Sequence, residues 1–279
     1  MVNSNGGLVE SDEMIGVGNR GFLFGDAVFE TIKICDGKVL FLEDHYFRLM
    51  ATMRIVRMEI PMNFTMEYLE AQVLQTVKAN HCENAARVRI TVFRNKGGLY
   101  LPETNAISFV VQALPIDTSD YIIKPLSYEV DLYKDFHIAK HLLSTLKTSN
   151  KMIYITGSIF AKENNLQNCL LLNEEKNVVE ALQGNIFMLM GNTLFTPPIA
   201  DGCLNGIMRK NILVIAKTVD GIEVIEKSIS PFELQKADEL FITNVIQGIQ
   251  PITKYRKKEY VSTLANRLVQ KLNATISGS

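Results

Sequence analysis

The sequence predicts a mixed α/β fold in two domains, on the basis of its length and of two kinds of apolar pattern. At 279 residues the chain is long for one small domain and short for three. Segments in which apolar residues alternate with polar ones, as in half-buried strands, occur beside segments with apolar residues at helical spacing. A loop-rich segment near the middle of the chain supplies a domain boundary.

The first strands that we predict form a hairpin. Residues 27–34 are rich in β-branched and aromatic side chains, and residues 38–42 resume an apolar run after Asp36-Gly37. An Asp-Gly pair between two such runs is a strong signal for a two-residue turn.

Two amphipathic helices and a second pair of strands should follow. Over residues 43–56 and 65–80 the apolar side chains recur on one helical face. The pattern then changes to period two in residues 87–94, which predicts a strand with one polar face. Residues 106–112 are the expected partner of that strand.

A loop composition rich in proline, aspartate and hydroxyl side chains marks residues 113–125 as the domain boundary. We therefore predict a smaller α/β domain over residues 1–115, a linker over 116–125 and a larger α/β domain over 126–279. Ser230-Pro231-Phe232-Glu233 has the pattern of a capping box with proline at the first helical position. In the larger domain we expect helices over 151–164, 206–219, 231–237 and 262–274, and strands over 170–172, 186–190 and 240–243.

Composition excludes several classes of function. With 47% hydrophobic and 21% charged residues the chain is typical of a globular protein, and its net charge of -1 argues against a nucleic-acid surface. Its four cysteines are far apart and form no CxxC pair, so no metal site or redox dithiol is indicated. Residues 1–18 lack the pattern of a secretory leader, and no apolar run is long enough for a membrane span. We expect a cytoplasmic protein.

Several segments carry polar groups suited to a phosphate and to amine chemistry. Residues 201–209 form a glycine-containing loop that opens a predicted helix, and residues 243–248 follow a predicted strand. Helix N-termini and strand ends of this kind bind phosphate, although most such loops only cap a helix. Arg48 could supply a cation and Glu180 a carboxylate, and each could equally be a solvated side chain. Lys147 is either a surface lysine or a reactive amine at the edge of a cavity.

Taken together and in order, these segments resemble the fold-type IV pyridoxal-phosphate enzymes. That group contains the branched-chain aminotransferases, the D-amino acid aminotransferases and the 4-amino-4-deoxychorismate lyases. The resemblance implies a two-domain architecture like that of the D-amino acid aminotransferases. It rests on residues 20–26 with 28–31, then 45–49, 87–94, 146–148, 179–180, 184–187, 196–197, 204–209 and 243–251.

The resemblance also implies a cofactor, pyridoxal 5′-phosphate, and the residues that hold it. Lys147, which lies in the predicted larger domain, matches the lysine that forms the Schiff base with the cofactor, and Glu180 matches the carboxylate at the pyridine nitrogen. The phosphate cup is matched by Arg48, Ile207, Met208, Asn244 and Val245, and the apolar contact with the ring by Leu204. The family usually works as a homodimer, in which a loop of the neighbour closes the site.

Two departures from the family pattern concern the substrate. Phe29 stands where the D-amino acid aminotransferases have a tyrosine, and Leu99 stands where lyases often have arginine after two glycines. Phe29 is still expected to face the substrate, and recognition of its carboxylate would fall to Arg94, Lys96 or Arg89.

Three functional alternatives follow from the resemblance. The segments around residues 205–209 and 243–251, with Phe29, look more like the aminodeoxychorismate lyases, which eliminate pyruvate and leave 4-aminobenzoate for folate synthesis. The second alternative is a transaminase that acts on a branched-chain or D-amino acid with 2-oxoglutarate. The third is a cofactor-binding protein without turnover, and the presence of both Lys147 and Glu180 argues against it.

Overall fold

The computed structural model describes residues 1–10 and 15–277, and these residues form two compact units. Of these described residues, those within Met1–Asp120 and Lys147–Asn150 form unit 1, and those within Tyr121–Leu146 and Lys151–Ser279 form unit 2. Residues 11–14, which belong to the polar start of the sequence, lie outside the described residues. None of the helices in the described parts of the chain combines the length and apolar character that a membrane crossing requires.

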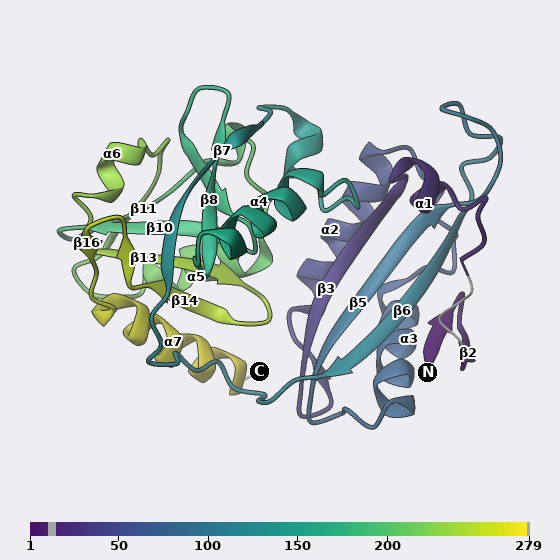
Figure 1. The fold of residues 1–279 in the computed structure, drawn as a ribbon. Helices are drawn as coiled ribbons and strands as arrows, with labels where there is room; N and C mark the ends of the chain where they lie inside the picture. The colour runs from purple at the N-terminus through teal and green to yellow at the C-terminus, as the bar shows by residue number, and fades with distance from the viewer. Residues whose placement is uncertain (11–14, 278–279) are drawn as a thin grey trace. The chain divides into compact units, whose positions relative to one another are not determined.

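Unit 1 is a six-stranded sheet with two long helices on one face (Figure 1). The strand order is β2-β1-β6-β5-β3-β4, and all neighbours are antiparallel. The elements are β1 (Val2–Ser4), β2 (Gly7–Val9), α1 (Arg20–Phe24), β3 (Ala27–Cys35), β4 (Lys38–Val39), α2 (Leu42–Ile55), α3 (Met66–Ala79), β5 (Ala85–Arg94) and β6 (Ile107–Pro115).

The core of unit 1 lies between this sheet and the helices α2 and α3. Ile32, Met53, Leu69 and Val88 are completely buried there. Alternation along β5 directs Val88 and its i+2 neighbours into this core and leaves the arginines between them on the other face. The apolar surface of α2 and α3 therefore fixes which face of the sheet carries the polar side chains.

Unit 2 contains two five-stranded sheets, of order β12-β11-β10-β13-β14 and β16-β15-β7-β8-β9. Its strands are β7 (Glu129–Ile138), β8 (Asn168–Asn173), β9 (Val178–Ala181), β10 (Asn185–Met190), β11 (Thr193–Thr196), β12 (Glu223–Glu226), β13 (Glu239–Asn244), β14 (Gly248–Ile252), β15 (Lys254–Tyr255) and β16 (Lys258–Glu259). Its helices are η1 (Leu142–Thr145), α4 (Met152–Glu163), η2 (Ile199–Asp201), α5 (Ile207–Ala216), α6 (Pro231–Leu234) and α7 (Thr263–Ser277).

The two sheets of unit 2 share a core. Leu170 and Val130 from one sheet pack with Met188, Leu240 and Ile252 from the other. A second cluster fills the space between the β7-β8-β9 sheet and α4. Helices α5 and α7 contact β13, so that unit 2 is layered as helix, sheet, sheet and helices.

Most of the predicted elements are confirmed within one to three residues of their predicted ends. The hairpin turns at Asp36-Gly37, where both residues have positive φ, and Ser230 forms the predicted capping box with Glu233. The predicted strand over residues 38–42 is wrong beyond Val39, because Phe41 adopts the left-handed conformation and starts α2 at Leu42.

The predicted division of the chain differs from the structure at two points. Strand β6 continues to Pro115, and the two units separate after Asp120. The sequence placed Lys147 in the larger domain, whereas the structure groups residues 147–150 with unit 1. The reason is a short strand-like pairing of these residues with β3.

Candidate functional site

Lys147 is fixed by backbone hydrogen bonds to the free edge of β3. The N–H of Phe29 donates to the Lys147 carbonyl at 2.9 Å, and the N–H of Ser149 donates to the Ala27 carbonyl at 2.9 Å. Val28 and Thr148 form the β-bridge between these two bonds. The lysine is thus held as part of a sheet and not as part of a mobile surface loop.

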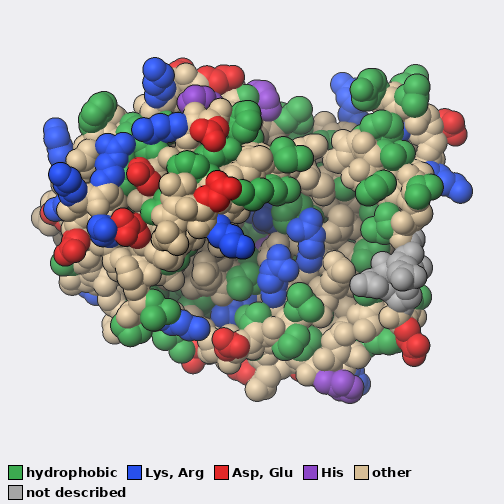
Figure 2. Space-filling model, in the orientation of Figure 1, with side chains coloured by type: hydrophobic (Ala, Val, Ile, Leu, Met, Phe, Trp, Pro, Cys, Tyr) green, Lys and Arg blue, Asp and Glu red, His purple; other side chains and the backbone are tan. Residues whose placement is uncertain are grey.

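The Lys147 amine lies against an aromatic ring that it shares with an arginine. Its Nζ is 4.4 Å from the centroid of the Phe29 ring, and Cζ of Arg89 is 3.7 Å from the same centroid. Arg89 also donates from Nε to the Thr91 hydroxyl at 3.1 Å. Burial and the neighbouring Arg87 lower the pKa of Arg89 below its usual range. In the space-filling view, lysine and arginine side chains gather beside β3 (Figure 2).

On the helix side of β3, Glu30 joins α2 to the sheet. The Arg48 guanidinium donates to both Glu30 oxygens, from Nε at 2.7 Å and from Nη2 at 2.6 Å. The Nδ1–H of His45 donates to Glu30 Oε2 at 2.7 Å. Burial alone would raise the pKa of Glu30, but Arg48 and His45 more than offset it and lower the pKa to about 2. The carboxylate is therefore ionised and sets the orientation of Arg48.

His45 is completely buried, and its Nε2 has no hydrogen-bond partner among the described residues. Burial lowers the pKa of His45, and the nearby Arg48 and Lys147 lower it further, although the Glu30 carboxylate acts in the opposite direction. The imidazole is therefore neutral at pH 7, with the proton on Nδ1.

In unit 2, Glu180 is a buried carboxylate on β9 with two donors. The Tyr154 hydroxyl donates to Oε1 at 2.5 Å, and the N–H of Leu204 donates to Oε2 at 3.0 Å. Burial and the negative charge of Glu180 raise the pKa of Tyr154, which keeps its hydroxyl protonated as a donor. Tyr154 was not among the predicted site residues, because its position on α4 opposite β9 is a tertiary contact.

The N-terminus of α5 is open to an anion. Its N-cap is Gly206, no side chain in the described part of the chain caps the helix, and Ile207 and Met208 form its first turn. A Cβ at residue 206 would collide with Oδ1 of Asn185, so glycine is required by close approach. Uncapped N–H groups and the helix dipole favour a phosphate at this position.

The turn between β13 and β14 lies close to this helix N-terminus. Asn185 donates to the Leu204 carbonyl at 2.8 Å and is the register partner of Thr243. Asn244 accepts from the N–H of Ile246 at 3.0 Å and of Gln247 at 2.9 Å, so its side chain stabilises the turn. The predicted contact of Asn244 and Val245 with phosphate would therefore come from the backbone. The buried Thr243 hydroxyl has no partner among the described residues.

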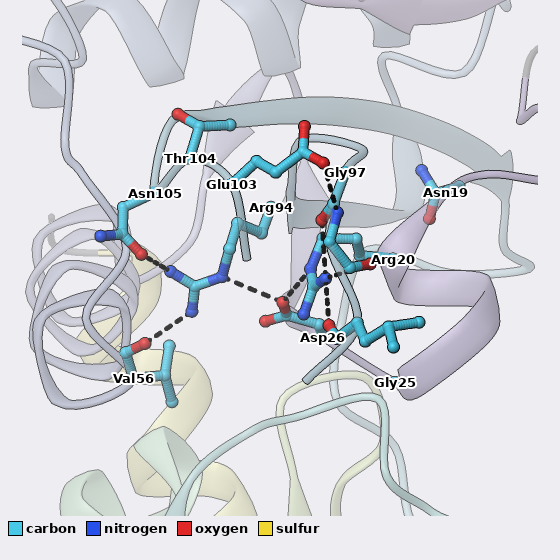
Figure 3. A network of polar contacts seen from close by, with 12 residues as sticks. Asn19, Arg20, Gly25, Asp26, Val56, Arg94, Gly97, Glu103, Thr104 and Asn105 are labelled. Atoms are coloured by element: carbon cyan, nitrogen blue, oxygen red, sulfur yellow. Dashed lines mark hydrogen bonds and ion pairs between the residues drawn. The ribbon is translucent and has the colours of Figure 1, made fainter. Parts of the chain in front are cut away.

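Arg94, predicted to be near the substrate, lies in a structural network (Figure 3). It donates from Nε to Asp26 at 2.9 Å, from Nη1 to Asn105 at 2.5 Å and from Nη2 to the Val56 carbonyl at 2.7 Å. Arg20 also donates to Asp26 and to the carbonyls of residues 97–99. These buried arginines fix the loop over residues 95–106. The hydrogen bonds of the Arg94 guanidinium are therefore used to hold this loop.

His141, which precedes the lysine, has a local structural contact. His141 accepts at Nδ1 from the N–H of Ser144 at 3.2 Å and is the N-cap of η1. His141 therefore stabilises the turn that precedes Lys147.

Residues 27–255 match the family model described as Amino-transferase class IV. The chain belongs to the class IV aminotransferase family. The matched span includes Lys147, Glu180, Arg48 and the N-terminus of α5. The fold-type IV assignment made from the sequence is confirmed, and the protein is an enzyme of this family.

Two relatives of this family member are described as aminotransferases. A "Putative branched-chain-amino-acid aminotransferase" of Methanocaldococcus jannaschii is 29% identical over 272 residues, which is 89% of this chain and 85% of the relative. D-alanine aminotransferase of Staphylococcus epidermidis is 25% identical over 260 residues, covering 90% of this chain and 87% of the relative.

Solved structures of other proteins share the fold of this chain. The branched-chain aminotransferase of Thermoproteus uzoniensis, solved with norvaline, has a TM-score of 0.88 at 26% identity, covering 99% of this chain and 94% of that one. A "Putative 4-amino-4-deoxychorismate lyase" of Legionella pneumophila has a TM-score of 0.83 at 23% identity, covering 94% of this chain and 97% of that one. At that identity the second likeness shows the fold alone.

The cofactor of class IV aminotransferases is pyridoxal 5′-phosphate, and the residues of this chain fit it. A buried carboxylate with two fixed donors, Glu180, suits a pyridinium nitrogen. A phosphate suits the helix N-terminus at Gly206 and the Thr243 hydroxyl, both of which lack a side-chain partner within residues 1–10 and 15–277. The Lys147 amine is the kind of nucleophile that binds the aldehyde of this cofactor.

The Glu30 cluster predicts a specific pH dependence. Because the pKa of Glu30 falls from 4.5 to about 2 on folding, its contribution is fully present above pH 4.5 and is lost as the pH falls from 4.5 to 2. We expect Glu30→Gln to lower the free energy of unfolding at pH 7 by about 3 kcal/mol. The difference from wild type, measured by urea unfolding, should shrink between pH 4.5 and pH 2.5. A constant difference over that range would contradict the assignment.

Proposed function

We propose that the protein is an amino-acid transaminase. The observation that carries the proposal is the pairing of an amine and a guanidinium on one ring, Lys147 and Arg89 on Phe29. An amine beside a carboxylate-binding cation suits a substrate that carries both an amino group and a carboxylate. Relatives that share 25% to 29% of their residues with most of this chain are described as aminotransferases, which supports transamination.

The lyase reaction, favoured by the sequence segments, becomes the alternative. It is supported by a likeness of fold at 23% identity and by Phe29 in place of a tyrosine. Both reactions would use Lys147 in the same way, so they are distinguished by substrate and not by this residue.

Each residue of the cofactor site has a proposed role. Lys147 binds the cofactor through its amine and, once released by the substrate, moves the proton at the substrate α-carbon. Glu180 keeps the pyridine nitrogen protonated, and Leu204 packs against the ring. When bound, the cofactor draws electrons from the bond that breaks at that carbon.

The phosphate is proposed to contact backbone and side-chain donors. The N–H groups of Ile207 and Met208 at the start of α5 face it, together with the backbone at Asn244 and Val245. Arg48, held by Glu30 in one orientation, supplies the positive charge.

The remaining site residues act on the substrate. Phe29 limits the space beside the Lys147 amine, and Arg89 binds a carboxylate. Arg94 is left out of this role because its guanidinium is bound by Asp26 and the loop.

The cofactor proposal is tested by absorption spectroscopy. Purified wild-type protein should show a visible absorption band of bound pyridoxal 5′-phosphate, and Lys147→Ala should abolish it, because the band requires the covalent link. Lys162→Ala, an exposed lysine on α4, is the matched control and should retain the band. A wild-type protein that takes up no pyridoxal phosphate would refute the proposal.

Two assays distinguish the transaminase from the lyase: 2-oxoglutarate-dependent deamination of amino acids, and pyruvate release from aminodeoxychorismate.

We also propose that the protein is a homodimer. Three apolar residues at the tip of the loop over residues 95–106 are highly exposed: Leu99 is 78%, Tyr100 91% and Leu101 84% exposed. Arg20 and Glu103 hold this loop in one conformation. A rigid loop with an apolar tip favours contact with another protein surface, and a second copy of the chain is the occupant that the family resemblance suggests.

Sedimentation tests the dimer. Wild-type protein should sediment as a dimer, and Leu101→Glu should shift it toward monomer because a charge would be buried at the contact. The control Val261→Glu changes another exposed apolar residue, 62% exposed, outside this loop and should leave the dimer intact. A fully active wild-type monomer would overturn the proposal.

The cytoplasmic location remains an expectation from the sequence.

A further inference from the structure

Lys151, at the start of α4, is placed against the preferences of a helix N-terminus. It is the N-cap residue, a position that favours a short side chain able to accept a hydrogen bond. In the described part of the chain its side chain makes no capping hydrogen bond. The helix dipole also disfavours a positive charge at this end. A residue that departs from two local preferences is expected to serve something other than the helix.

The Lys151 amine lies over the ring of Tyr154, three residues farther along the chain. Its Nζ is 4.3 Å from the centroid of that ring. Burial lowers the pKa of Lys151 below its usual value of 10.5, and the Glu180 carboxylate acts in the opposite direction. The carboxylate therefore favours the ammonium form of Lys151, and the two charged groups attract each other within unit 2.

Tyr154 connects Lys151 to Glu180. Its hydroxyl donates to Glu180 Oε1 at 2.5 Å, which is short and typical of a bond to an ionised carboxylate. A cation over an aromatic ring attracts its electrons, so the hydroxyl on that ring becomes a stronger donor. Lys151 thus acts on Glu180 both by its charge and through the Tyr154 hydroxyl.

The packing of α4 fixes this chain of contacts. A Cβ at Gly157 would meet Leu182 at 2.6 Å and the Tyr133 ring at 3.3 Å, so glycine allows the helix to approach the sheet closely. Tyr154 lies on α4 about one turn before Gly157 and reaches Glu180 on β9.

Cys203, which precedes Leu204, is a further titratable neighbour of Glu180. Burial and the charge of Glu180 raise the pKa of the Cys203 thiol to about 12, with Arg209 opposing and Asp201 adding to the rise. Burial and Glu180 also raise the pKa of Tyr154. Both Cys203 and Tyr154 are therefore neutral at pH 7, whereas Lys151 brings a charge.

We propose that Lys151 and Tyr154 are positioning residues for Glu180, which stabilise its ionised form and so moderate how strongly the pyridine nitrogen of bound pyridoxal 5′-phosphate holds its proton. This inference rests on the proposed role of Glu180 at that nitrogen. A nearby cation and a donated hydrogen bond both favour an ionised carboxylate. Removing either one should therefore let Glu180 and the pyridine nitrogen keep their shared proton to a higher pH.

NMR of the holoenzyme, with the cofactor isotope-labelled at the pyridine nitrogen, follows this proton as the pH is raised. Lys151→Met should raise the midpoint of the titration by about half a pH unit or more, and Tyr154→Phe by about one pH unit. Lys151→Arg keeps a cation that stacks on the ring and should stay close to wild type. Lys162→Met changes an exposed lysine on the same helix and is the matched control, which should leave the midpoint unchanged.

Glu180→Gln separates a failure of the inference from a failure of the proposed function. Midpoints at or below the wild-type value in both Lys151→Met and Tyr154→Phe would overturn the inference. If Glu180→Gln lowers the midpoint in that case, Glu180 keeps its proposed role and the inference alone fails. If Glu180→Gln also leaves the midpoint unchanged, the proposed role of Glu180 fails with it.

A second measurement needs no cofactor. Carbon NMR of protein labelled at the glutamate carboxyl carbons follows Glu180, whose signal is identified by its loss in Glu180→Gln. The carboxyl should take up its proton at a higher pH in Lys151→Met and Tyr154→Phe than in wild type, while Lys151→Arg and Lys162→Met should match wild type. Equal titration of Glu180 in wild type, Lys151→Met and Tyr154→Phe would contradict the inference, whatever the outcome for the cofactor.

Discussion

The pairing of the lysine segment with β3 is the constraint on which the site depends. Two backbone hydrogen bonds, from Phe29 to Lys147 and from Ser149 to Ala27, join segments more than a hundred residues apart in sequence. They fix the Lys147 amine relative to the strand that carries Phe29 on one face and Glu30 on the other. Because every neighbouring side chain of β3 follows from strand alternation, this one pairing determines which groups meet the amine.

Arginines of unit 1 have two kinds of surroundings. Glu30 forms an ion pair with Arg48, and Asp26 forms ion pairs with both Arg20 and Arg94; these pairs connect α2 and the loop over residues 95–106 to the sheet. Arg89 instead lies on an aromatic ring beside the lysine. The first arrangement connects elements of the fold, and the second places the positive charge of Arg89 on the same ring as the Lys147 amine.

The elements that sequence could predict are those with strong local signals. The Asp36-Gly37 turn, the alternation along β5 and the capping box at Ser230 depend on neighbouring residues and were placed correctly. Short strands such as β1 and β12 have too few residues for a period, and β7 follows a loop without a turn signal. Tyr154 on α4 contacts Glu180 on β9 only through the tertiary fold, so no spacing in the sequence indicates it. The commitment of Arg94 to Asp26 was hidden for the same reason.

We propose that Lys147, and no other lysine, holds the cofactor. Borohydride reduction of the holoenzyme would make that link permanent, and digestion with trypsin followed by mass spectrometry would locate it. We expect a phosphopyridoxyl mass on the peptide His141–Lys151, with cleavage blocked after Lys147. The same mass on Lys151 or on any other lysine, or no modified peptide from a protein that shows the visible band, would contradict it.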